Sequence, residues 1–113
     1  MQPGEIFLAN FPLGGGPGMK LRPVLLLTGP IGDVPEVLVA YISSVVPSNL
    51  LPSDIVLDPV QPDHVTTNLK TTSMLRLHKL ATIHRRSLIR LLGRISDSTA
   101  VNVATKLRAL LEL

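Results

Sequence analysis

The chain has 113 residues, enough for one hydrophobic core, and we expect a single domain over residues 1–113. It contains no cysteine, which excludes a disulfide scaffold, thiolate chemistry and a cysteine-ligated metal site. No apolar run approaches the roughly 18 residues that a membrane span needs, and no signal peptide is visible, so we expect a soluble, cytoplasmic protein.

The net charge of +3 conceals an uneven distribution of charge. The segment between His64 and Ser96 has no aspartate or glutamate, and it holds all three histidines together with Lys70, Arg76, Lys79, Arg85, Arg86, Arg90 and Arg94. Such a block is typical of proteins that bind a polyanion, although it also occurs on the solvated face of a basic protein.

Most apolar segments are short and bounded by Gly, Pro, Asn or Asp, which is typical of strands. We expect strands near Glu5–Phe11, Arg22–Thr28, Glu36–Ser44, Asp54–Leu57, Ser73–Ile83 and Leu88–Ile95. The tail differs, because apolar residues recur there at helical spacing, at Ala100, Val103, Ala104, Leu107, Leu110 and Leu111. Ser96, Asp97 or Ser98 can cap this helix by accepting a free backbone N–H. The pattern favours a mainly β fold, a small antiparallel barrel with one C-terminal helix packed on it.

The stretch GGGPGMKLRPVLLL, residues 14–27, places four glycines before the second strand. It is not a phosphate-binding P-loop, because that motif needs G-K-[ST] at the start of a helix, whereas here Met19 separates Gly18 from Lys20 and a strand follows. Two interpretations of the stretch remain, a plain hairpin loop and a flexible cover over a site. Arg22, fixed before Pro23 at the start of the strand, is well placed to bind an anionic oxygen.

Four stretches in chain order, GEIFLANF, LRPVLLLTG, VAYISS and SMLRLHKLATIHRRSLIRLLGRIS, resemble the MazF/PemK family of toxin endoribonucleases from bacterial toxin–antitoxin pairs. The resemblance implies an SH3-like barrel that forms a homodimer and binds a cognate antitoxin. It also implies cleavage of single-stranded RNA, such as mRNA, at specific sequences without a metal or other cofactor, which inhibits growth. In that reaction the ribose 2′-OH attacks the adjacent phosphate and leaves a 2′,3′-cyclic phosphate and a 5′-OH.

The family's catalytic residues are carried over only where this sequence matches its motifs. The arginine of the family's R-P motif falls on Arg22, the hydroxyl of its I-T-S motif on Ser43 with Ser44 after it, and its late-strand arginine on Arg76. The sequence departs from the pattern twice, because Ser43 replaces the usual threonine and His78 replaces the acid of R-x-D.

The spacing of Arg76 and His78 predicts that both project from one face of a strand, about 7 Å apart. The opposite face is then expected to be apolar, interrupted by Lys79 and built from Leu75, Leu77, Ala81 and Ile83. Histidine transfers protons near neutral pH, since its unperturbed pKa is about 6.5.

We therefore interpret His78 as the base that accepts the 2′-OH proton. In this interpretation Arg22 and Arg76 stabilise the charge of the phosphorane, and Ser43 donates a hydrogen bond to a phosphate oxygen. We expect further RNA contacts from Lys20, Ser44, Lys70, Lys79, Arg85 and Arg86.

Two features limit other kinds of site. His64 and His84 lack the spacing of metal ligands, so no metal site is expected. The aromatic residues are Phe7, Phe11 and Tyr41, which makes the base-stacking platform small and shifts recognition toward charge and hydrogen bonding.

Two alternatives to a nuclease stay open. The first is a catalytically silent barrel of the same fold that binds a protein target, as gyrase-directed relatives do, or binds nucleic acid without cutting it; the replacement at His78 is the reason to keep it. The second is an interaction module whose basic segment binds an acidic peptide such as an antitoxin tail.

Overall fold

The computed structural model describes residues 1–11 and 20–113, with the side chain of Phe11 left aside. The glycine-rich stretch 14–18 lies outside the described residues, so its function as a cover over the site stays a prediction. Within the described part, no helix has the length and apolarity to cross a membrane.

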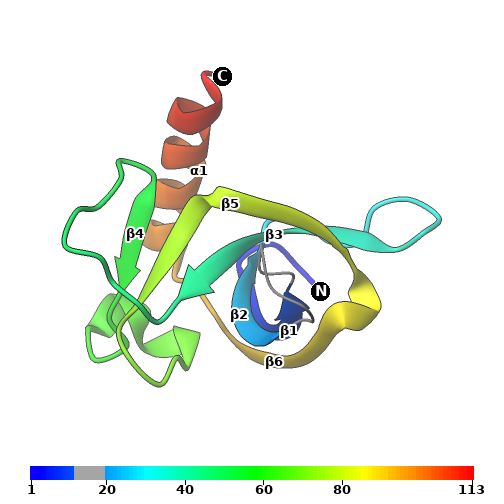
Figure 1. Ribbon diagram of the computed structural model, residues 1–113, viewed down its shortest axis with the longest axis horizontal. Coiled ribbons are helices and arrows are strands. Elements are labelled where there is room, and N and C mark those ends of the chain that lie inside the picture. The colour runs from blue at the N-terminus through cyan, green and yellow to red at the C-terminus, as the bar shows by residue number, and fades with distance from the viewer. Residues whose placement is uncertain (12–19) are drawn as a thin grey trace.

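Over the described residues the structure is a six-stranded antiparallel sheet with one C-terminal helix, which confirms the expected mainly β fold. The strands follow the spatial order β4-β5-β3-β2-β1-β6, and the sheet curls so that β5, β3, β2, β1 and β6 surround a common axis (Figure 1). The elements are β1 (Glu5–Phe11), β2 (Lys20–Leu26), β3 (Glu36–Ser43), β4 (Asp54–Leu57), the 3₁₀ helices η1 (Pro62–Thr67) and η2 (Arg85–Ser87), β5 (Ser73–His84), β6 (Leu88–Arg94) and α1 (Asp97–Leu111).

The described residues form two apolar core clusters on opposite faces of this sheet, because successive side chains of a strand alternate between faces. One cluster includes Phe7 and Val24, and the other includes Ile6 and Leu25. Val103 of α1 belongs to the second cluster, so the helix covers that face. Burial on both faces explains the long apolar runs in the sequence of β2 and β3.

The expected apolar face of β5 was wrong in one respect. β5 pairs with β3 through Ala40↔Leu80 and then Tyr41↔Arg76, so the three residues from Leu77 to Lys79 have no partner in β3. This bulge shifts the alternation of side chains by an odd number of positions. As a result Leu75 and Leu77 pack in the cluster under α1, while Ala81 and Ile83 pack in the other cluster.

The helix α1 begins where the sequence predicts. Ser96 is its N-cap and its side chain accepts a hydrogen bond from Thr99 N at 3.2 Å. The carboxylate of Asp63 in η1 accepts from the hydroxyls of Ser98 and Thr99, at 2.7 and 3.2 Å, and so ties η1 to the helix. The helix η1 itself was not predicted, because six residues are too short for a periodic signal.

Candidate functional site

One row of directly paired residues crosses the sheet and changes from apolar to charged along its length. Phe7 pairs with Val24, Val24 with Tyr41, Tyr41 with Arg76, and Arg76 with Asp54. Phe7 and Val24 belong to a core cluster on which Tyr41 packs. The charged end of the row therefore lies where β4 and β5 extend beyond the curled part of the sheet (Figure 1).

The carboxylate of Asp54 is fully buried and pairs with Arg76. Arg76 donates from Nε to Oδ1 at 3.3 Å and from Nη2 to Oδ2 at 3.4 Å, while its own side chain is 20% exposed. The backbone N–H of Leu51 donates to Oδ2 at 2.8 Å, and Asp54 N donates back to the carbonyl of Leu51 at 3.0 Å. A buried carboxylate held by both a turn and an arginine has a fixed position.

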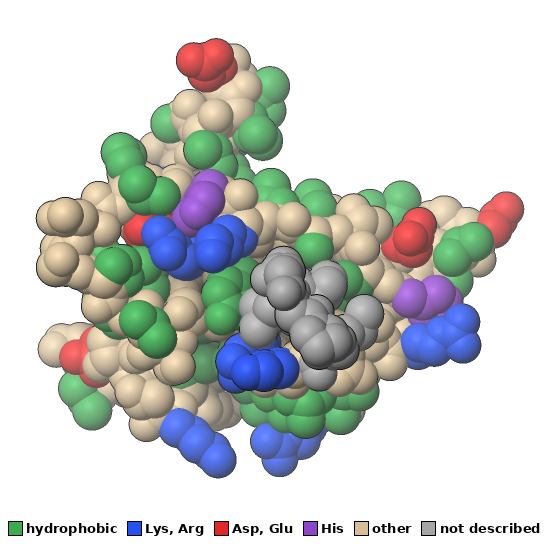
Figure 2. All heavy atoms as spheres, viewed as in Figure 1, with side chains coloured by type: hydrophobic (Ala, Val, Ile, Leu, Met, Phe, Trp, Pro, Cys, Tyr) green, Lys and Arg blue, Asp and Glu red, His purple; other side chains and the backbone are tan. Residues whose placement is uncertain are grey.

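His78 turns toward the same carboxylate. Its Nδ1 lies 4.0 Å from Oδ1 of Asp54, and its side chain is 31% exposed. Arg76 and His78 thus lie together, as their spacing predicts, with one edge of each side chain against Asp54 and part of each side chain exposed. Figure 2 shows a histidine flanked by Lys and Arg side chains on the face over β5, below α1.

Sequence reasoning missed Asp54. Its sequence distance from Arg76 is 22 positions, and no local motif connects the two. One signal was available, because Asp54 is the sole carboxylate between Glu36 and Asp58 and stands at the start of a predicted strand. The pairing of β4 with β5 makes it the acidic neighbour of Arg76 and His78.

Arg22 lies near the start of β2, and its Nε is buried without a hydrogen-bond partner among the residues that the structure describes. A buried guanidinium N–H without an acceptor is costly, so this group is suited to an anionic ligand. Continuing the β2–β3 register beyond Val24↔Tyr41 places Arg22 beside Ser43. From Arg76 it is two strands away, about 10 Å across the sheet and about 7 Å along it.

Ser43, at the end of β3, already accepts a hydrogen bond from Val45 N at 3.1 Å. Since that bond uses a lone pair of the hydroxyl oxygen, the O–H remains able to donate to a ligand.

A pocket of about 300 Å³ lies between the start of β2, the end of β3, the segment after η1, and β6. Arg22, Ser44, Lys70 and Arg90 line it, above apolar side chains that include Ile42. Among the described residues, Arg76 and His78 are not part of its lining. The predicted site residues therefore form two neighbouring groups, one on β5 and one around this pocket.

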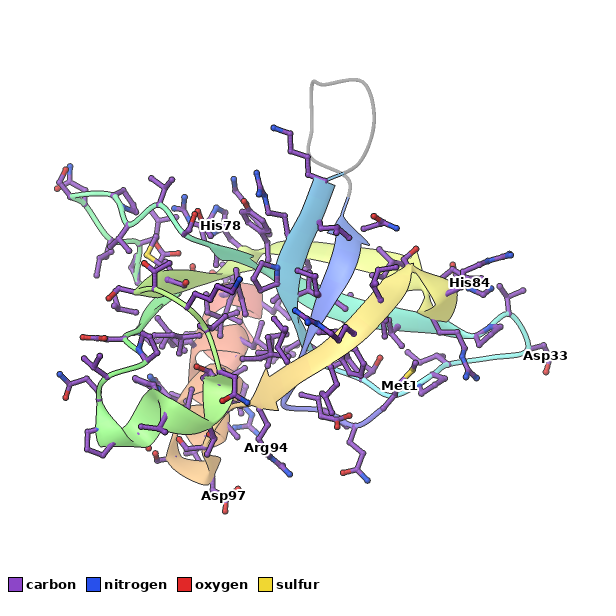
Figure 3. All side chains as sticks on the ribbon, turned by 90° about the horizontal axis from the view of Figure 1, so that it is seen from below. Met1, Asp33, His78, His84, Arg94 and Asp97 are labelled. Atoms are coloured by element: carbon purple, nitrogen blue, oxygen red, sulfur yellow. The ribbon has the colours of Figure 1, made fainter. Side chains whose placement is uncertain are left out.

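The remaining predicted RNA contacts are distributed unevenly. Lys20 is exposed and stands two positions before Arg22 in β2, so the two side chains leave the same face of the strand. Nζ of Lys79 lies 5.7 Å from the centre of the ring of Tyr41, the residue that pairs with Arg76. Arg85 and Arg86 form η2 at the far end of β5, where Figure 3 places His84 well away from His78. The structure does not bring these two arginines to the site.

The other histidines have separate surroundings. His84 Nδ1 accepts a hydrogen bond from Arg86 N at 3.1 Å and so caps η2. His64 lies in η1, and its buried Nδ1 has no hydrogen-bond partner among the described residues. In the part of the chain that the structure describes, no three His, Cys, Asp or Glu side chains are grouped as metal ligands would be.

The comparison with protein families gives one match over nearly the whole chain. Residues 2–111 match the family described as PemK-like, MazF-like toxin of type II toxin-antitoxin system. No curated protein sequence matches the chain significantly.

Solved structures of similar fold include toxins from mycobacteria and from Deinococcus radiodurans. A Mycobacterium tuberculosis toxin, MazF-mt6, superposes with a TM-score of 0.73 at 24% identity, covering 96% of this chain and 97% of that chain. MazF from Deinococcus radiodurans superposes with a TM-score of 0.67 at 18% identity, covering 99% and 96%. An endoribonuclease from a mycobacterial species, solved in complex with its cognate antitoxin, has a TM-score of 0.69 at 17% identity, covering 100% and 96%.

Proposed function

Because the chain belongs to the family of PemK-like, MazF-like toxins of type II toxin–antitoxin systems, we propose that it is a growth-inhibiting endoribonuclease. It cleaves single-stranded RNA at specific sequences, without a metal, to a 2′,3′-cyclic phosphate and a 5′-OH. The observation that carries the proposal is the arrangement of Arg76 and His78, which lie side by side against one buried carboxylate while each stays partly exposed.

In the proposed reaction, His78 removes the proton from the ribose 2′-OH. The 2′ oxygen then attacks the adjacent phosphorus, and the bond from phosphorus to the 5′ oxygen breaks. The leaving oxygen takes a proton from solvent and becomes the 5′-OH, while the 2′ oxygen, the 3′ oxygen and phosphorus form the cyclic phosphate. A histidine is suited to the first step because imidazole exchanges protons near neutral pH.

The phosphorane that forms during this step carries extra negative charge. Arg76 and Arg22 stabilise it from two sides, and Ser43 donates a hydrogen bond to a phosphate oxygen. The unpartnered, buried Nε of Arg22 supports its part, since a phosphate oxygen is the acceptor that this N–H lacks among the described residues.

The RNA on either side of the scissile phosphate is bound mainly through charge. Lys20, Ser44, Lys70 and Lys79 flank the site or line its pocket, which supports their role as backbone contacts. Arg85 and Arg86 reach RNA only if the strand continues around β5 to η2, so we propose them as peripheral contacts.

We further propose that the toxin is a homodimer neutralised by a cognate antitoxin. Support comes from the family and from the mycobacterial relative that was solved with its antitoxin. The acid-free segment between His64 and Ser96 suits an acidic antitoxin tail, which then competes with RNA for the same basic surface.

The test is an incubation of the purified protein with end-labelled single-stranded RNA in EDTA, followed by mapping of the new ends. We expect cyclic-phosphate and 5′-OH ends with the wild-type protein. His78→Ala is expected to reduce the single-turnover rate by roughly 10²–10⁴-fold, the range for loss of a general base. Arg22→Ala is expected to reduce it by roughly 10²–10³-fold, as for loss of a preorganised charge donor.

His84→Ala is the matched control, because it removes a histidine from the other end of the same strand. Its single-turnover rate at saturating RNA is expected to equal that of the wild type. Absence of cleavage across RNAs of varied sequence would contradict the proposal and favour a silent barrel that acts by binding.

A further inference from the structure

The buried carboxylate of Asp54 has no assigned role in the proposed reaction, yet it contacts both residues placed at the phosphate. A fully buried charge destabilises a fold unless it is paired and hydrogen-bonded. Asp54 meets that condition through Arg76 and through the backbone N–H of Leu51. Replacing such a buried pair as a whole by apolar residues is often neutral for stability, so stability alone does not explain why Asp54 and Arg76 are both charged.

We infer that Asp54 is a positioning residue of the proposed nuclease, an inference that rests on the proposed function. Asp54 fixes the guanidinium of Arg76 and sets the imidazole of His78 in the tautomer whose Nε2 accepts a proton. It does not touch RNA, because its carboxylate is completely buried.

The effect on Arg76 follows from the donors that the pair uses. A guanidinium carries five N–H donors, and Asp54 accepts from Nε and from Nη2. These two contacts orient the plane of the guanidinium and leave the other N–H groups for a phosphate oxygen. Because the two partners are held in the sheet by the pairing of β4 with β5, less side-chain entropy is lost when RNA binds.

The effect on His78 is electrostatic. The distance of 4.0 Å between Nδ1 and Oδ1 is longer than a direct hydrogen bond. Of the two neutral tautomers, a negative charge on that side nevertheless favours the one with its proton on Nδ1, which leaves the lone pair on Nε2. That nitrogen is the one farther from Asp54, where a ribose hydroxyl can approach.

The carboxylate is itself held in place from the other side. Leu51 N donates to Oδ2, and Asp54 N donates to the Leu51 carbonyl, which closes a turn at the end of the loop before β4. An asparagine at this position keeps one oxygen that can still accept from Leu51, but it has neither the negative charge nor the second acceptor. Asp54→Asn therefore tests the charge with the least disturbance of the turn.

The experiment is a ¹⁵N NMR measurement of the His78 tautomer, at an alkaline pH where imidazole is neutral, on the wild type and on Asp54→Asn. We expect the Nδ1–H tautomer in the wild type and a shift toward Nε2–H in the variant. Single-turnover cleavage is measured beside it, and we expect Asp54→Asn to lower the rate constant roughly 10–100-fold with little change in the RNA concentration for half-saturation.

Asp58→Asn is the matched control. Asp58 also accepts a local backbone hydrogen bond, from Val60 N at 3.2 Å, but it lies beyond the other end of β4. The His78 tautomer and the cleavage rate of Asp58→Asn are expected to match those of the wild type. Histidine spectra of all three proteins also report whether each is folded.

The possible outcomes distinguish the positioning role of Asp54 from the proposed nuclease function. An unchanged His78 tautomer in folded Asp54→Asn overturns the positioning role, even if cleavage slows. The Nε2–H form in the wild type overturns it as well, and this measurement needs no variant. If the wild type cuts no RNA, the proposed function fails, while the tautomer measurement still decides whether Asp54 sets the state of His78.

Discussion

Adding a single methyl group at Gly93 of β6 is expected to lower the free energy of unfolding strongly. A Cβ at this residue meets the carbonyl oxygens of Thr66 and Thr67 in η1, the second at 2.6 Å. Both contacts are with backbone, so no side chain can rotate away. Gly93→Ala therefore has to push η1 away from β6.

The size of the effect follows from what holds η1 in place on either side of Gly93. Thr66 Oγ1 donates to the Arg94 carbonyl at 2.9 Å, and Asn68 Nδ2 donates to the Leu92 carbonyl at 2.7 Å. Overpacking destabilises by about 1–3 kcal/mol, and two strained hydrogen bonds add about 1 kcal/mol each. The lower entropy of the unfolded alanine chain offsets about 0.4–1 kcal/mol, which leaves a loss of about 2–4.6 kcal/mol in the free energy of unfolding.

Thermal unfolding followed by circular dichroism measures this loss. The entropy of unfolding is about 0.24 kcal/mol/K for a chain of 113 residues, so Tm is expected to fall by roughly 8–19 °C. Gly29→Ala is the control, because the nearest atom to its Cβ is the carbonyl oxygen of Met1 at 3.3 Å, at a terminus that can shift. A Gly93→Ala variant that unfolds within 1 °C of Gly29→Ala would refute the reasoning.

Three further substitutions test the contacts around η1 and α1. The hydroxyls of Ser98, Ser96 and Thr99 hold the pKa of the Asp63 carboxyl below its usual value. The stability that the charged carboxylate gains from these hydrogen bonds is fully present above the ordinary carboxyl pKa of about 3.9. It is lost as the pH falls through the lower pKa of the folded state. Asp63→Asn is thus expected to be less stable than the wild type at neutral pH in urea unfolding, with a difference that begins to shrink near pH 4 and vanishes below the lower folded pKa. Ser96→Ala removes the N-cap of α1 and is expected to reduce the free energy of unfolding by about 1 kcal/mol, an effect absent if the cap is replaced by Thr. Lys70→Ala is expected to reduce the salt dependence of RNA affinity by about one counterion while the single-turnover rate stays unchanged; an unaltered slope would remove Lys70 from the RNA contacts.

The local structure of this protein could largely be predicted from its sequence. Glu5–Phe11 and Asp54–Leu57 are strands with the predicted limits, and the other strands differ by one or two residues at their ends. The second strand, predicted to reach Thr28, ends at Leu26, where the Thr28 hydroxyl replaces a backbone acceptor for Leu38 N. Such patterns are readable because side-chain alternation, turn residues and helix caps act over a few neighbouring positions.

The candidate site could be predicted from the sequence only in part. The spacing of Arg76 and His78 within one strand, and the position of Arg22 before a proline, are local features, and the sequence identified these residues as candidates. It also grouped Arg85 and Arg86 with them, although the length of β5 carries that pair to the opposite end of the strand. Their contribution to RNA binding stays a prediction.

The sequence by itself determined the strands, the capped terminal helix, and the basic residues that a polyanion requires. Only the tertiary structure decided which of them meet. The register of β4 on β5 brings Asp54 to Arg76 and His78, and the bulge at Leu77–Lys79 sends the two halves of β5 into different core clusters. Strand pairing and its register depend on burial over the whole sheet. The residues next to Arg76 and His78 in the sequence therefore do not indicate which distant carboxylate will lie beside them.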